Sequence, residues 1–533
     1  MSGRNSRIAI WLPLVLALCL VAGMVIGNLF RNNPGSEMPV KIFAGDNKLN
    51  SVLNYIGQNY VDTVRIDSIT EEMIPVILEK LDPHSIYIPN REVKSVNETL
   101  RGNFDGIGVQ FNMQNDTILV IQLIKGGPSA KAGIMPGDRI ISVDGIPVAG
   151  VKMPEDSIVE KLRGPRGSEV KVGIYRKRTK QRMVYSLKRG VIPVTSVDVA
   201  YMITDNIGFI KINTFSQTTY SEFQEGLAKL KRHGCTKLII DLRGNSGGIM
   251  EPAIRIADDF LKKGDLIVYT QGRARAREEY RATQEDMGEE LGLAILIDEG
   301  SASASEIVAG AIQDNDRGLI IGRRSFGKGL VQEQAMLNDG SALRLTTARY
   351  YTPTGRSIQK PYTNGIDDYY LDIARRYRKG EFMSADSIHF SESLKFTTPK
   401  GRMVYGGGGI MPDYFIPYDT AGITPFFVKI NQANLIYTYA LAYSDLHRDE
   451  LSVFNKVDEL SDYLDSQNVL DKFKSHVLAN GYTPTPTEWK ESKLIIQTQL
   501  KAYIARNFLD NDGFYPIVQA IDNTLIQAVK LMK

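Results

Sequence analysis

Three serines and one lysine lie in a short stretch whose residue types could carry out proton-transfer chemistry. Ser301, Ser303 and Ser305 follow an apolar run at residues 293–297, and Lys328 lies further along between two glycines. A hydroxyl becomes a strong nucleophile when a base removes its proton, and a lysine can act as that base only as the neutral amine. Lowering a lysine pKa from about 10.4 to about 7 by burial costs roughly 4–5 kcal/mol, which a packed, largely apolar site can sustain. A serine nucleophile with a lysine base is therefore chemically feasible here.

The elements around these residues are those that would position them. The run 293–297 is typical of a strand buried on both faces of a parallel sheet, and the apolar spacing after it predicts a helix over about residues 305–313. At a helix start, free N–H groups and the helix dipole stabilise a developing oxyanion. If residues 330–333 form a strand, Gln332 faces the same side as Lys328, and its amide can orient the amine.

Histidine is a poorer candidate for the base. No histidine lies between His233 and His389, so a Ser-His pair would need a distant one. His84 is expected to be a capping or packing residue. Asp314 could support the lysine, but we interpret it as a structural residue at the end of the helix.

The same stretch resembles the C-terminal processing, or tail-specific, serine peptidases. The matching parts are the Ser-Ala-Ser-Ala-Ser-Glu run at 301–306, Phe-Gly-Lys-Gly at 326–329, and a glutamine four residues after the lysine. The resemblance implies a Ser-Lys dyad whose nucleophile precedes the lysine by 25 positions, which selects Ser303 and Lys328. It also implies Gln332 as the third member. A Ser/Ala-rich helix cap followed by a surface lysine is the alternative interpretation.

A glycine-rich turn at residues 241–248 follows another predicted strand. It lacks the Lys-Ser/Thr pair of a P-loop and contains no G-x-G-x-x-G, so a nucleotide site is not indicated. It resembles the family's Asp-Leu-Arg-x-Asn-x-Gly-Gly turn. That resemblance implies one oxyanion N–H from Gly247 or Gly248 and a second from Ala304, the residue after the serine. Such donors would be worth roughly 3–4 kcal/mol each.

Residues 104–189 resemble a PDZ domain. The Gly-Ile-Gly-Val sequence at Gly106, Ile107, Gly108 and Val109 matches the carboxylate-binding loop, and the sequences GPSAKAG and MPGDRI follow it. The resemblance implies that an extended peptide adds as a strand beside residues 108–112 while the loop holds its terminal carboxylate. The expected partners are therefore proteins or peptides with free C-termini.

The predicted fold class is α/β, with a crotonase/ClpP-like peptidase core, an inserted PDZ domain, an N-terminal helical region and a C-terminal helical extension. The predicted segments are a membrane anchor or signal (1–30), a linker and helical region (31–102), the PDZ domain (103–190), the peptidase core (191–420) and the extension (421–533). Within the extension we expect helices over residues 451–464 and 516–531. It could be a helical platform or a contact in a homo-oligomer.

Composition adds few constraints. The chain has 533 residues, a net charge of +3 and two cysteines, so neither a nucleic-acid partner nor an intrachain disulfide in the folded body is indicated. No clustered His, Cys or Asp spacing suggests a metal, and the Ser-Lys mechanism needs no cofactor.

Residues 8–27 form an uncharged apolar run preceded by Arg4 and Arg7. Twenty helical residues span about 30 Å, the thickness of a bilayer core. We expect an uncleaved anchor with the catalytic body outside the cytoplasm, in the cell envelope. A cleaved signal peptide is the alternative.

These features favour an anchored serine endopeptidase that holds a protein C-terminus in its PDZ groove and cleaves nearby through an acyl-enzyme. A PDZ scaffold on an inactive α/β body is a second hypothesis, but it does not explain why serine, lysine and oxyanion glycine occur together. An acyl-CoA enzyme of the crotonase type is a third, but it predicts neither an anchor nor a PDZ insertion.

Overall fold

The computed structural model describes residues 21, 48–114, 116–283, 288–389 and 391–533, and it divides into two compact units, one ending at Ile74 and the other covering Pro75–Lys533. The first unit contains helix α2 (Lys48–Asn59) and the beginning of α3 (Ile66–Glu79). Among the residues that the structure describes, no helix is both long and apolar enough to cross a bilayer. The predicted membrane segment, residues 8–27, lies outside the described residues except for Val21.

The PDZ module is built on an antiparallel sheet with the order β3-β4-β5-β7-β8, and β6 pairs with β5. Its elements are β3 (Val109–Met113), β4 (Ile118–Leu123), α5 (Pro128–Ala132), β5 (Arg139–Val143), β6 (Ile146–Pro147), α6 (Glu155–Leu162), β7 (Glu169–Arg176) and β8 (Gln181–Lys188). Asp144 and Gly145 both have positive φ, 49° and 79°, as a tight two-residue hairpin requires. Strand β2 (Asn103–Gly106) pairs with β9 (Gly190–Pro193) where the chain enters and leaves the module.

The central sheet has the order β10-β11-β12-β15-β16-β21 and is parallel except for the β10–β11 pair. Its strands are β10 (Val197–Met202), β11 (Ile207–Ile212), β12 (Lys237–Asp241), β15 (Gly292–Ile297), β16 (Leu319–Gly322) and β21 (Tyr414–Phe415). The near-continuous apolar sequences of β12 and β15 fit a sheet covered on both faces. The carboxyl ends of β12 and β15 lead into the two loops in which the sequence predicts the oxyanion turn and the serines.

Helices cover both faces of this sheet. Helices α7 (Thr219–Arg232), α8 (Met250–Asp258) and α9 (Ala304–Asp314) pack on the face that bears Ile240 and Ile295. On the opposite face, Ile239 and Leu296 pack against the last helix, α18 (Asn523–Met532). The C-terminal extension therefore completes the core around the central sheet.

A second sheet carries the lysine segment. Its order is β1-β18-β13-β14, and β17 pairs with β18. The strands are β1 (Ile86–Ile88), β13 (Leu266–Gln271), β14 (Glu278–Arg281), β17 (Leu330–Met336) and β18 (Ala342–Tyr351). Strand β17 begins two residues after Lys328, as the sequence predicted.

Short elements complete the core around these sheets. They are α4 (Asn90–Arg101), α10 (Ile366–Tyr370), α11 (Asp372–Arg378), η1 (Ala385–Ser387), η2 (Glu392–Leu394), β19 (Lys395–Thr397) and β20 (Met403–Tyr405).

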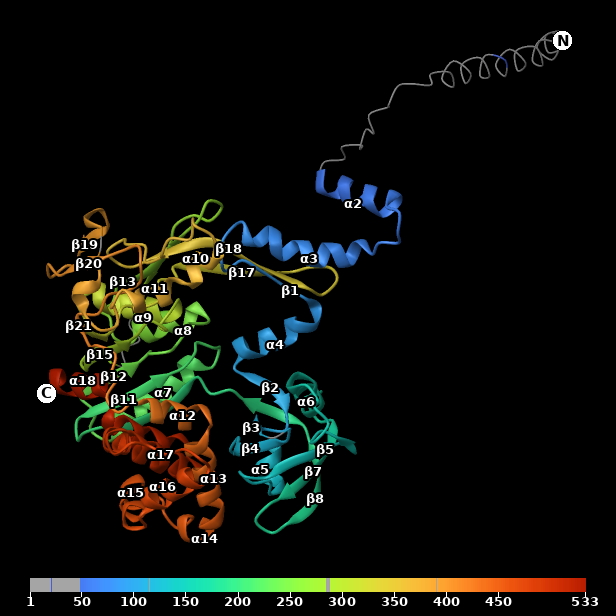
Figure 1. Cartoon of the computed structure of the whole chain (residues 1–533). Coiled ribbons are helices and arrows are strands. Elements are labelled where there is room, and N and C mark those ends of the chain that lie inside the picture. The colour runs from blue at the N-terminus through green and yellow to red at the C-terminus, as the bar shows by residue number, and fades with distance from the viewer. Residues whose placement is uncertain (1–20, 22–47, 115, 284–287, 390) are drawn as a thin grey trace, which may run out of the picture. The chain divides into compact units, whose positions relative to one another are not determined.

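The C-terminal extension is helical, as predicted, and Figure 1 shows its orange and red helices gathered in one group. They are α12 (Pro425–Gln432), α13 (Leu435–Leu446), α14 (Arg448–Leu451), α15 (Val457–Ser466), α16 (Val469–Ala479), α17 (Pro486–Val518) and η3 (Gln519–Ile521), followed by α18. A separate apolar core holds them together.

Two helix predictions in this region were wrong. The expected helix over 451–464 is divided between α14 and α15, because apolar spacing alone does not reveal a short interruption within one packed cluster. The expected helix over 516–531 is broken before α18, where the Asp522 side chain accepts a hydrogen bond from Leu525 N at 3.1 Å and caps a new helix. Pro516 lies inside α17, beyond a kink at Asp510 (φ 52°, ψ −142°).

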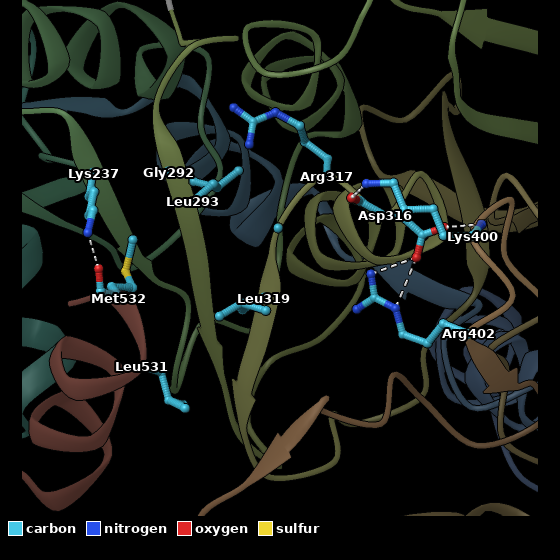
Figure 2. Close-up of a pocket in the computed structure, with 11 residues that line it drawn as sticks. Lys237, Gly292, Leu293, Asp316, Arg317, Leu319, Lys400, Arg402, Leu531 and Met532 are labelled. Atoms are coloured by element: carbon cyan, nitrogen blue, oxygen red, sulfur yellow. Dashed lines mark hydrogen bonds and ion pairs between the residues drawn. The ribbon is translucent and has the colours of Figure 1, made fainter.

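The helix α18 is also fixed at its end. Figure 2 shows Lys237 pointing toward the carbonyl of Met532, to which its amine donates a hydrogen bond; the amine also lies 3.3 Å from the carbonyl oxygen of Lys533. The cavity beside it, of about 540 Å³, contains further basic groups, but Lys400 and Arg402 both bond to Asp316. No serine lines this cavity among the described residues, so we do not assign it the chemistry.

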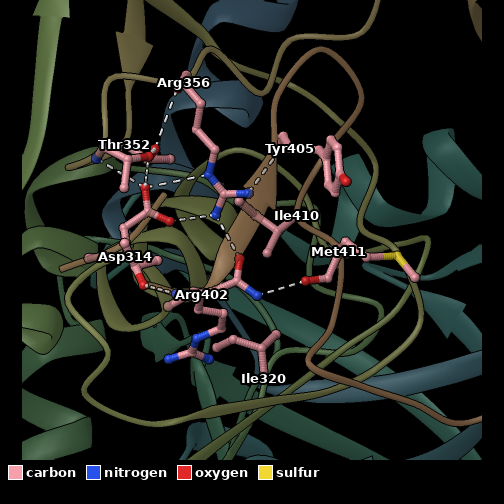
Figure 3. A network of polar contacts seen from close by, with 12 residues as sticks. Asp314, Ile320, Thr352, Arg356, Arg402, Tyr405, Ile410 and Met411 are labelled. Atoms are coloured by element: carbon pink, nitrogen blue, oxygen red, sulfur yellow. Dashed lines mark hydrogen bonds and ion pairs between the residues drawn. The ribbon is translucent and has the colours of Figure 1, made fainter. Parts of the chain in front are cut away.

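A fully buried ion pair joins the end of α9 to the loop after β18. Arg356 Nη2 lies 2.6 Å from Asp314 Oδ1, and both side chains are 0% exposed. Figure 3 shows Arg356 beside Asp314 and Tyr405, and Arg356 also donates to the Tyr405 carbonyl at 2.9 Å. A further bond goes from Arg356 to the Gln313 side chain at 2.7 Å. This agrees with the structural interpretation of Asp314.

We expect Arg356→Met to destabilise the protein by about 3–5 kcal/mol, because Asp314 would be left as a buried charge without its cation. Urea unfolding followed by fluorescence measures the change. Arg275→Met is the matched control: its ion pair with Glu333 is about half exposed, 54% and 48%, so water screens it and its loss should change stability far less than Arg356→Met does. Equal effects of the two changes would contradict this assignment.

Candidate active site

Ser303 lies at the end of the loop that connects strand β15 to helix α9. It is the N-cap residue of α9 and has φ 54° and ψ −113°, a backbone conformation that is strained for a residue with a side chain. The neighbouring serines are engaged elsewhere: Ser301 Oγ donates to the Leu242 carbonyl at 2.8 Å, and Ser305 Oγ donates to the Asn245 carbonyl at 2.9 Å. Of the three serines, only Ser303 lines the cavity described below.

Glu306 joins the serine and lysine segments. One carboxylate oxygen, Oε2, accepts hydrogen bonds from the backbone amides of Ser303 and Lys328, both at 2.9 Å. The other, Oε1, accepts from Ser325 Oγ at 2.5 Å and from Gly327 N at 2.7 Å. The carboxyl is fully buried, and burial raises its pKa to about 7 against the opposing effect of these four donors. Because two amides meet at one oxygen, Ser303 and Lys328 are held as neighbours.

Tyr350 adds a second link between the same two residues. Its hydroxyl lies 3.0 Å from the Ser303 carbonyl oxygen and 2.5 Å from that of Lys328. The side chain is 1% exposed, and burial raises its pKa well above the ordinary value. The hydroxyl therefore stays protonated and shares its proton between the two carbonyls.

The Lys328 amine is half-buried and has one neutral partner. Its Nζ lies 3.2 Å from Gln332 Oε1, as the strand alternation predicted. Gln332 Nε2 in turn donates to the carbonyl of His84, which fixes the orientation of the amide. Burial lowers the pKa of Lys328, and the positive charge of Arg344 lowers it further; Glu306 and Asp82 act in the opposite direction. The environment therefore favours the neutral amine.

The His84 ring is a packing element. Its Nε2 lies 2.8 Å from the hydroxyl of Tyr369, and the two rings meet edge to face at 5.2 Å. Burial and the charge of Lys328 lower its pKa to about 4, so the ring is neutral near pH 7. This agrees with the sequence interpretation, while its backbone carbonyl supports Gln332.

A single cavity of about 480 Å³ brings six of the predicted site residues together: Ser303, Ala304, Lys328, Gln332, Gly247 and Gly248. Most of its other walls are apolar, from Leu100, Ile249, Met250, Ile307, Leu330 and Val331. An apolar cavity with few polar groups is suited to hold a peptide side chain beside the serine.

The two candidate oxyanion glycines differ in what their amides do. Gly247 N donates to the Asn245 side chain at 2.8 Å, so this amide is already used. In the part of the chain that the structure describes, the amides of Gly248 and Ala304 have no hydrogen-bond acceptor. Gly248 thus fits the donor role better than Gly247, which instead permits close approach: a Cβ there would lie 2.7 Å from Ser303 Cβ.

We expect Gly247→Ala to lower kcat by about 100-fold, because its methyl group would push the turn away from the serine and displace the oxyanion donors. Gly244→Ala is the matched control. It has φ +72°, so it carries the same kind of backbone strain, but its added Cβ would meet no atom within 4 Å. Peptidase assays and thermal unfolding of both variants test this. Equal losses of activity in the two would show that backbone strain, not the close contact, matters.

The four predicted PDZ-loop residues lie outside this cavity, in their own module. Gly106 ends β2, Ile107 is buried, Gly108 has φ +75° and Val109 begins β3. Strand β3 is at the end of its sheet's order, so one of its edges has no strand partner among the described residues. Ile158 and Leu162 of α6 pack in the same core as Ile107. A strand edge and a helix are the walls that a bound peptide strand requires.

Sequence reasoning did not recognise the roles of Glu306 and Tyr350. Glu306 was noted only as the last residue of the Ser-Ala-Ser-Ala-Ser-Glu run, without a role of its own. Ser303 and Glu306 form the S-x-x-E spacing of a capping box, and that signal could have indicated the bond between Glu306 and the Ser303 amide. No local signal in the sequence reveals the contacts of Tyr350, because its partners lie 47 and 22 residues away.

Comparisons with known proteins identify the family. Residues 206–369 match the model described as peptidase family S41, and residues 106–185 match a PDZ domain model. The carboxy-terminal-processing protease of Bartonella bacilliformis is 37% identical over 317 residues, which cover 58% of this chain and 72% of that protein. This chain belongs to peptidase family S41. It is a serine-type, C-terminal processing peptidase with a PDZ domain, so the predicted family, enzyme class and fold are confirmed.

A second relative agrees with this membership. The carboxy-terminal processing protease CtpA of Bacillus subtilis is 35% identical over 344 residues, 63% of this peptidase and 73% of that protein. Among solved structures, the photosystem II D1 C-terminal processing protease is 27% identical and covers 57% of this chain and 82% of its own, with a TM-score of 0.34. Residues 426–510 match a family of unknown function.

Proposed function

We propose that this peptidase cleaves near protein C-termini with Ser303 as nucleophile and Lys328 as general base. The observation that carries the proposal is the meeting of the Ser303 and Lys328 amides at one Glu306 oxygen, with both residues lining one cavity. A lysine in this position needs no histidine partner, because burial and the nearby Arg344 charge favour its neutral form.

The reaction proceeds in two halves. The Ser303 Oγ proton passes to Lys328 Nζ while Oγ bonds to the scissile carbonyl carbon, and the amides of Ala304 and Gly248 hold the resulting oxyanion. The C–N bond then breaks as Lys328 returns the proton to the leaving amine, which leaves an acyl-enzyme. In the second half, Lys328 takes a proton from water, the hydroxide displaces Ser303 from the acyl group, and the proton returns to Oγ.

Gln332 acts as the positioning residue in this scheme. Its Oε1 accepts from the Lys328 amine, and its Nε2 is fixed by the His84 carbonyl. A neutral amide orients the amine without adding a negative charge, which would raise the lysine pKa. This supports glutamine as the third member.

The PDZ module supplies substrate recognition in our proposal. The relatives are named for carboxy-terminal processing, and PDZ domains bind peptide C-termini by β-strand addition. The Gly106–Val109 loop would hold the terminal carboxylate, and the free edge of β3 (Val109–Met113) would pair with the peptide.

We also propose that residues 8–27 anchor the peptidase in the cell envelope with its body outside the cytoplasm. The apolar run and the preceding Arg4 and Arg7 support this. Protease accessibility of the C-terminal helices in intact cells or spheroplasts, compared with lysed ones, tests the orientation.

A homo-oligomer that forms through the helical extension is a further proposal. The molecular mass of the protein in solution tests it.

An acyl-enzyme trapping experiment tests the catalytic assignment. The purified chain is mixed with an activated ester of an apolar amino acid at a pH where the peptidase is active, quenched with acid after a short time, and its intact mass is measured. We expect one acyl adduct, located on Ser303 by peptide mapping and lost in Ser303→Ala. Ser305→Ala is the matched control and should still form the adduct, because Ser305 does not line the cavity. An adduct on any other residue would overturn the assignment.

A further inference from the structure

Arg344 places a cation in the wall of the catalytic cavity. It lies in β18, where it pairs with Gln334 of β17 and with Ile86 of β1. Its side chain lines the same cavity as Ser303 and Lys328. The mechanism proposed above gives this guanidinium no bond to make.

In the part of the chain that the structure describes, the guanidinium has no acidic partner. Its Nη2 donates to Gln334 Oε1 at 2.9 Å, and among the described residues no carboxylate forms an ion pair with it. Burial lowers its pKa, which reflects a desolvation that no internal negative charge offsets. An arginine that is fully removed from water is almost always paired, and Arg344, which is half-buried, makes its hydrogen bond to an uncharged amide.

Three acidic groups on neighbouring segments already accept hydrogen bonds from other donors. Glu306 already accepts four hydrogen bonds, from the backbone amides of Ser303, Gly327 and Lys328 and from Ser325 Oγ. Asp82 accepts from the amides of His84 and Ser85 and from two hydroxyls. Glu333 makes two hydrogen bonds to Arg275. The half-buried guanidinium in the cavity wall is therefore available to a carboxylate that arrives with the substrate.

We propose that Arg344 is a specificity-determining residue that binds a carboxylate of the substrate peptide close to the scissile bond. This rests on the proposed function, because that function makes the cavity the place where the peptide is cut. A guanidinium presents paired N–H donors that match a carboxylate, and the apolar walls around it strengthen the interaction. The carboxylate is either an Asp or Glu side chain or the terminal carboxylate of a short leaving segment.

We expect the interaction between the substrate carboxylate and Arg344 to lower KM and not to raise kcat. A bound carboxylate interacts with Arg344 before and during the reaction, so it stabilises the substrate complex and the transition state alike. It also offsets part of the positive charge that favours neutral Lys328, so it gives no increase in kcat. We expect removal of the carboxylate to raise KM by about ten-fold.

Paired peptides test the proposal and separate the two sources. One series moves a single Glu, or Gln as its uncharged match, through each position around the cut. A second compares peptides with a free or amidated C-terminus and a short leaving segment. We expect one series to show the ten-fold difference in wild type and no difference in Arg344→Met. The PDZ module is also proposed to bind the terminal carboxylate, so amidation can raise KM without any part played by Arg344. In the second series we therefore compare the effect of amidation on KM in wild type with its effect on KM in Arg344→Met.

Matched variants make the test specific. Arg344→Lys keeps the charge and should keep part of the preference, and Arg344→Glu should reverse it toward lysine at the same position. Arg349→Met is the control, since Arg349 lies exposed on the same strand, bonds to the Tyr362 hydroxyl and does not line the cavity; it should retain the wild-type preference.

An unchanged preference in Arg344→Met, at every position and at the terminus, would overturn the inference. So would a variant that shifts only the pH dependence of kcat/KM, because Arg344 would then act on the charge of Lys328 alone. Either result leaves the proposed function intact as long as peptides are cut and Ser303 is acylated. Failure of acylation at Ser303 would instead count against the proposed function.

Discussion

Replacing Lys328 with methionine should lower kcat by about 10⁴-fold, because the serine loses the base that accepts its proton. Methionine keeps most of the side-chain volume and apolar contact, so the cavity should retain its shape. KM for a peptide should change little, since the PDZ module and the apolar walls still bind it. Steady-state peptidase assays, with thermal unfolding as the check on folding, measure this result.

Lys328→Arg distinguishes a base from a fixed charge. Arginine retains the positive charge but cannot lose a proton in a protein, so this variant should be as inactive as the methionine variant. If Lys328 served only to attract or position the substrate electrostatically, arginine would preserve much of the activity. Activity of Lys328→Arg near the wild-type level would therefore refute the general-base role.

The pH dependence follows from the same assignment. The active form is the neutral amine, so activity rises with pH as Lys328 loses its proton. Because burial and Arg344 lower the pKa of Lys328, this rise should occur below its ordinary value of 10.5. Ser303 acylation rates measured across pH test it. A rise that begins only above that value would mean that the amine is not desolvated in the working enzyme.

Most of the fold could be predicted from patterns of residues that lie close together in the chain. The apolar run of β15 and the small residues after it indicated the strand and helix around Ser303, and the alternation after Lys328 placed Gln332 beside the amine. These predictions succeeded because each depends on residues close in the chain. The PDZ module was recognisable for the same reason, since its glycine loop and Gly-Asp turn lie within one continuous segment.

Contacts between distant segments could not be predicted in this way. The sequence left Gly247 and Gly248 equivalent, and only the bond from Gly247 N to Asn245 separates them. The link from Tyr350 to the two catalytic backbones depends on how β18 packs against the serine loop. The break before α18 depends on a cap at Asp522, which also bonds to Arg243 of the glycine-rich turn. In each case a long-range contact decides between local alternatives.

Glu306→Gln should lower kcat by about 100-fold while Ser303 and Lys328 remain in the chain. Each Glu306 oxygen accepts two hydrogen bonds. An amide replaces one oxygen with an NH₂ group, which donates and cannot accept, so two of the four bonds are lost and donors face donors. The serine and lysine backbones then separate, and small errors in reacting geometry have large effects on rate.

Glu299→Gln is the matched control for this change. Glu299 lies four residues before Ser303 and bonds to Arg323 at 2.8 Å, and it does not line the cavity. A glutamine can still accept that bond, so kcat should stay within about two-fold of wild type. Parallel unfolding curves separate a positioning effect from a general loss of stability. If Glu306→Gln is destabilised but the folded fraction retains full kcat, the positioning role is wrong.

A pH profile provides a readout that a purely structural role would not change. Burial raises the pKa of Glu306 to about 7, so the wild-type carboxyl gains a proton as the pH falls through that value. The protonated oxygen loses acceptor capacity, and activity should fall with it. Glutamine cannot ionise, so Glu306→Gln should already have the low rate and show no step near pH 7. A step of equal size in both proteins would assign the titration to another group and remove Glu306 from control of the catalytic geometry.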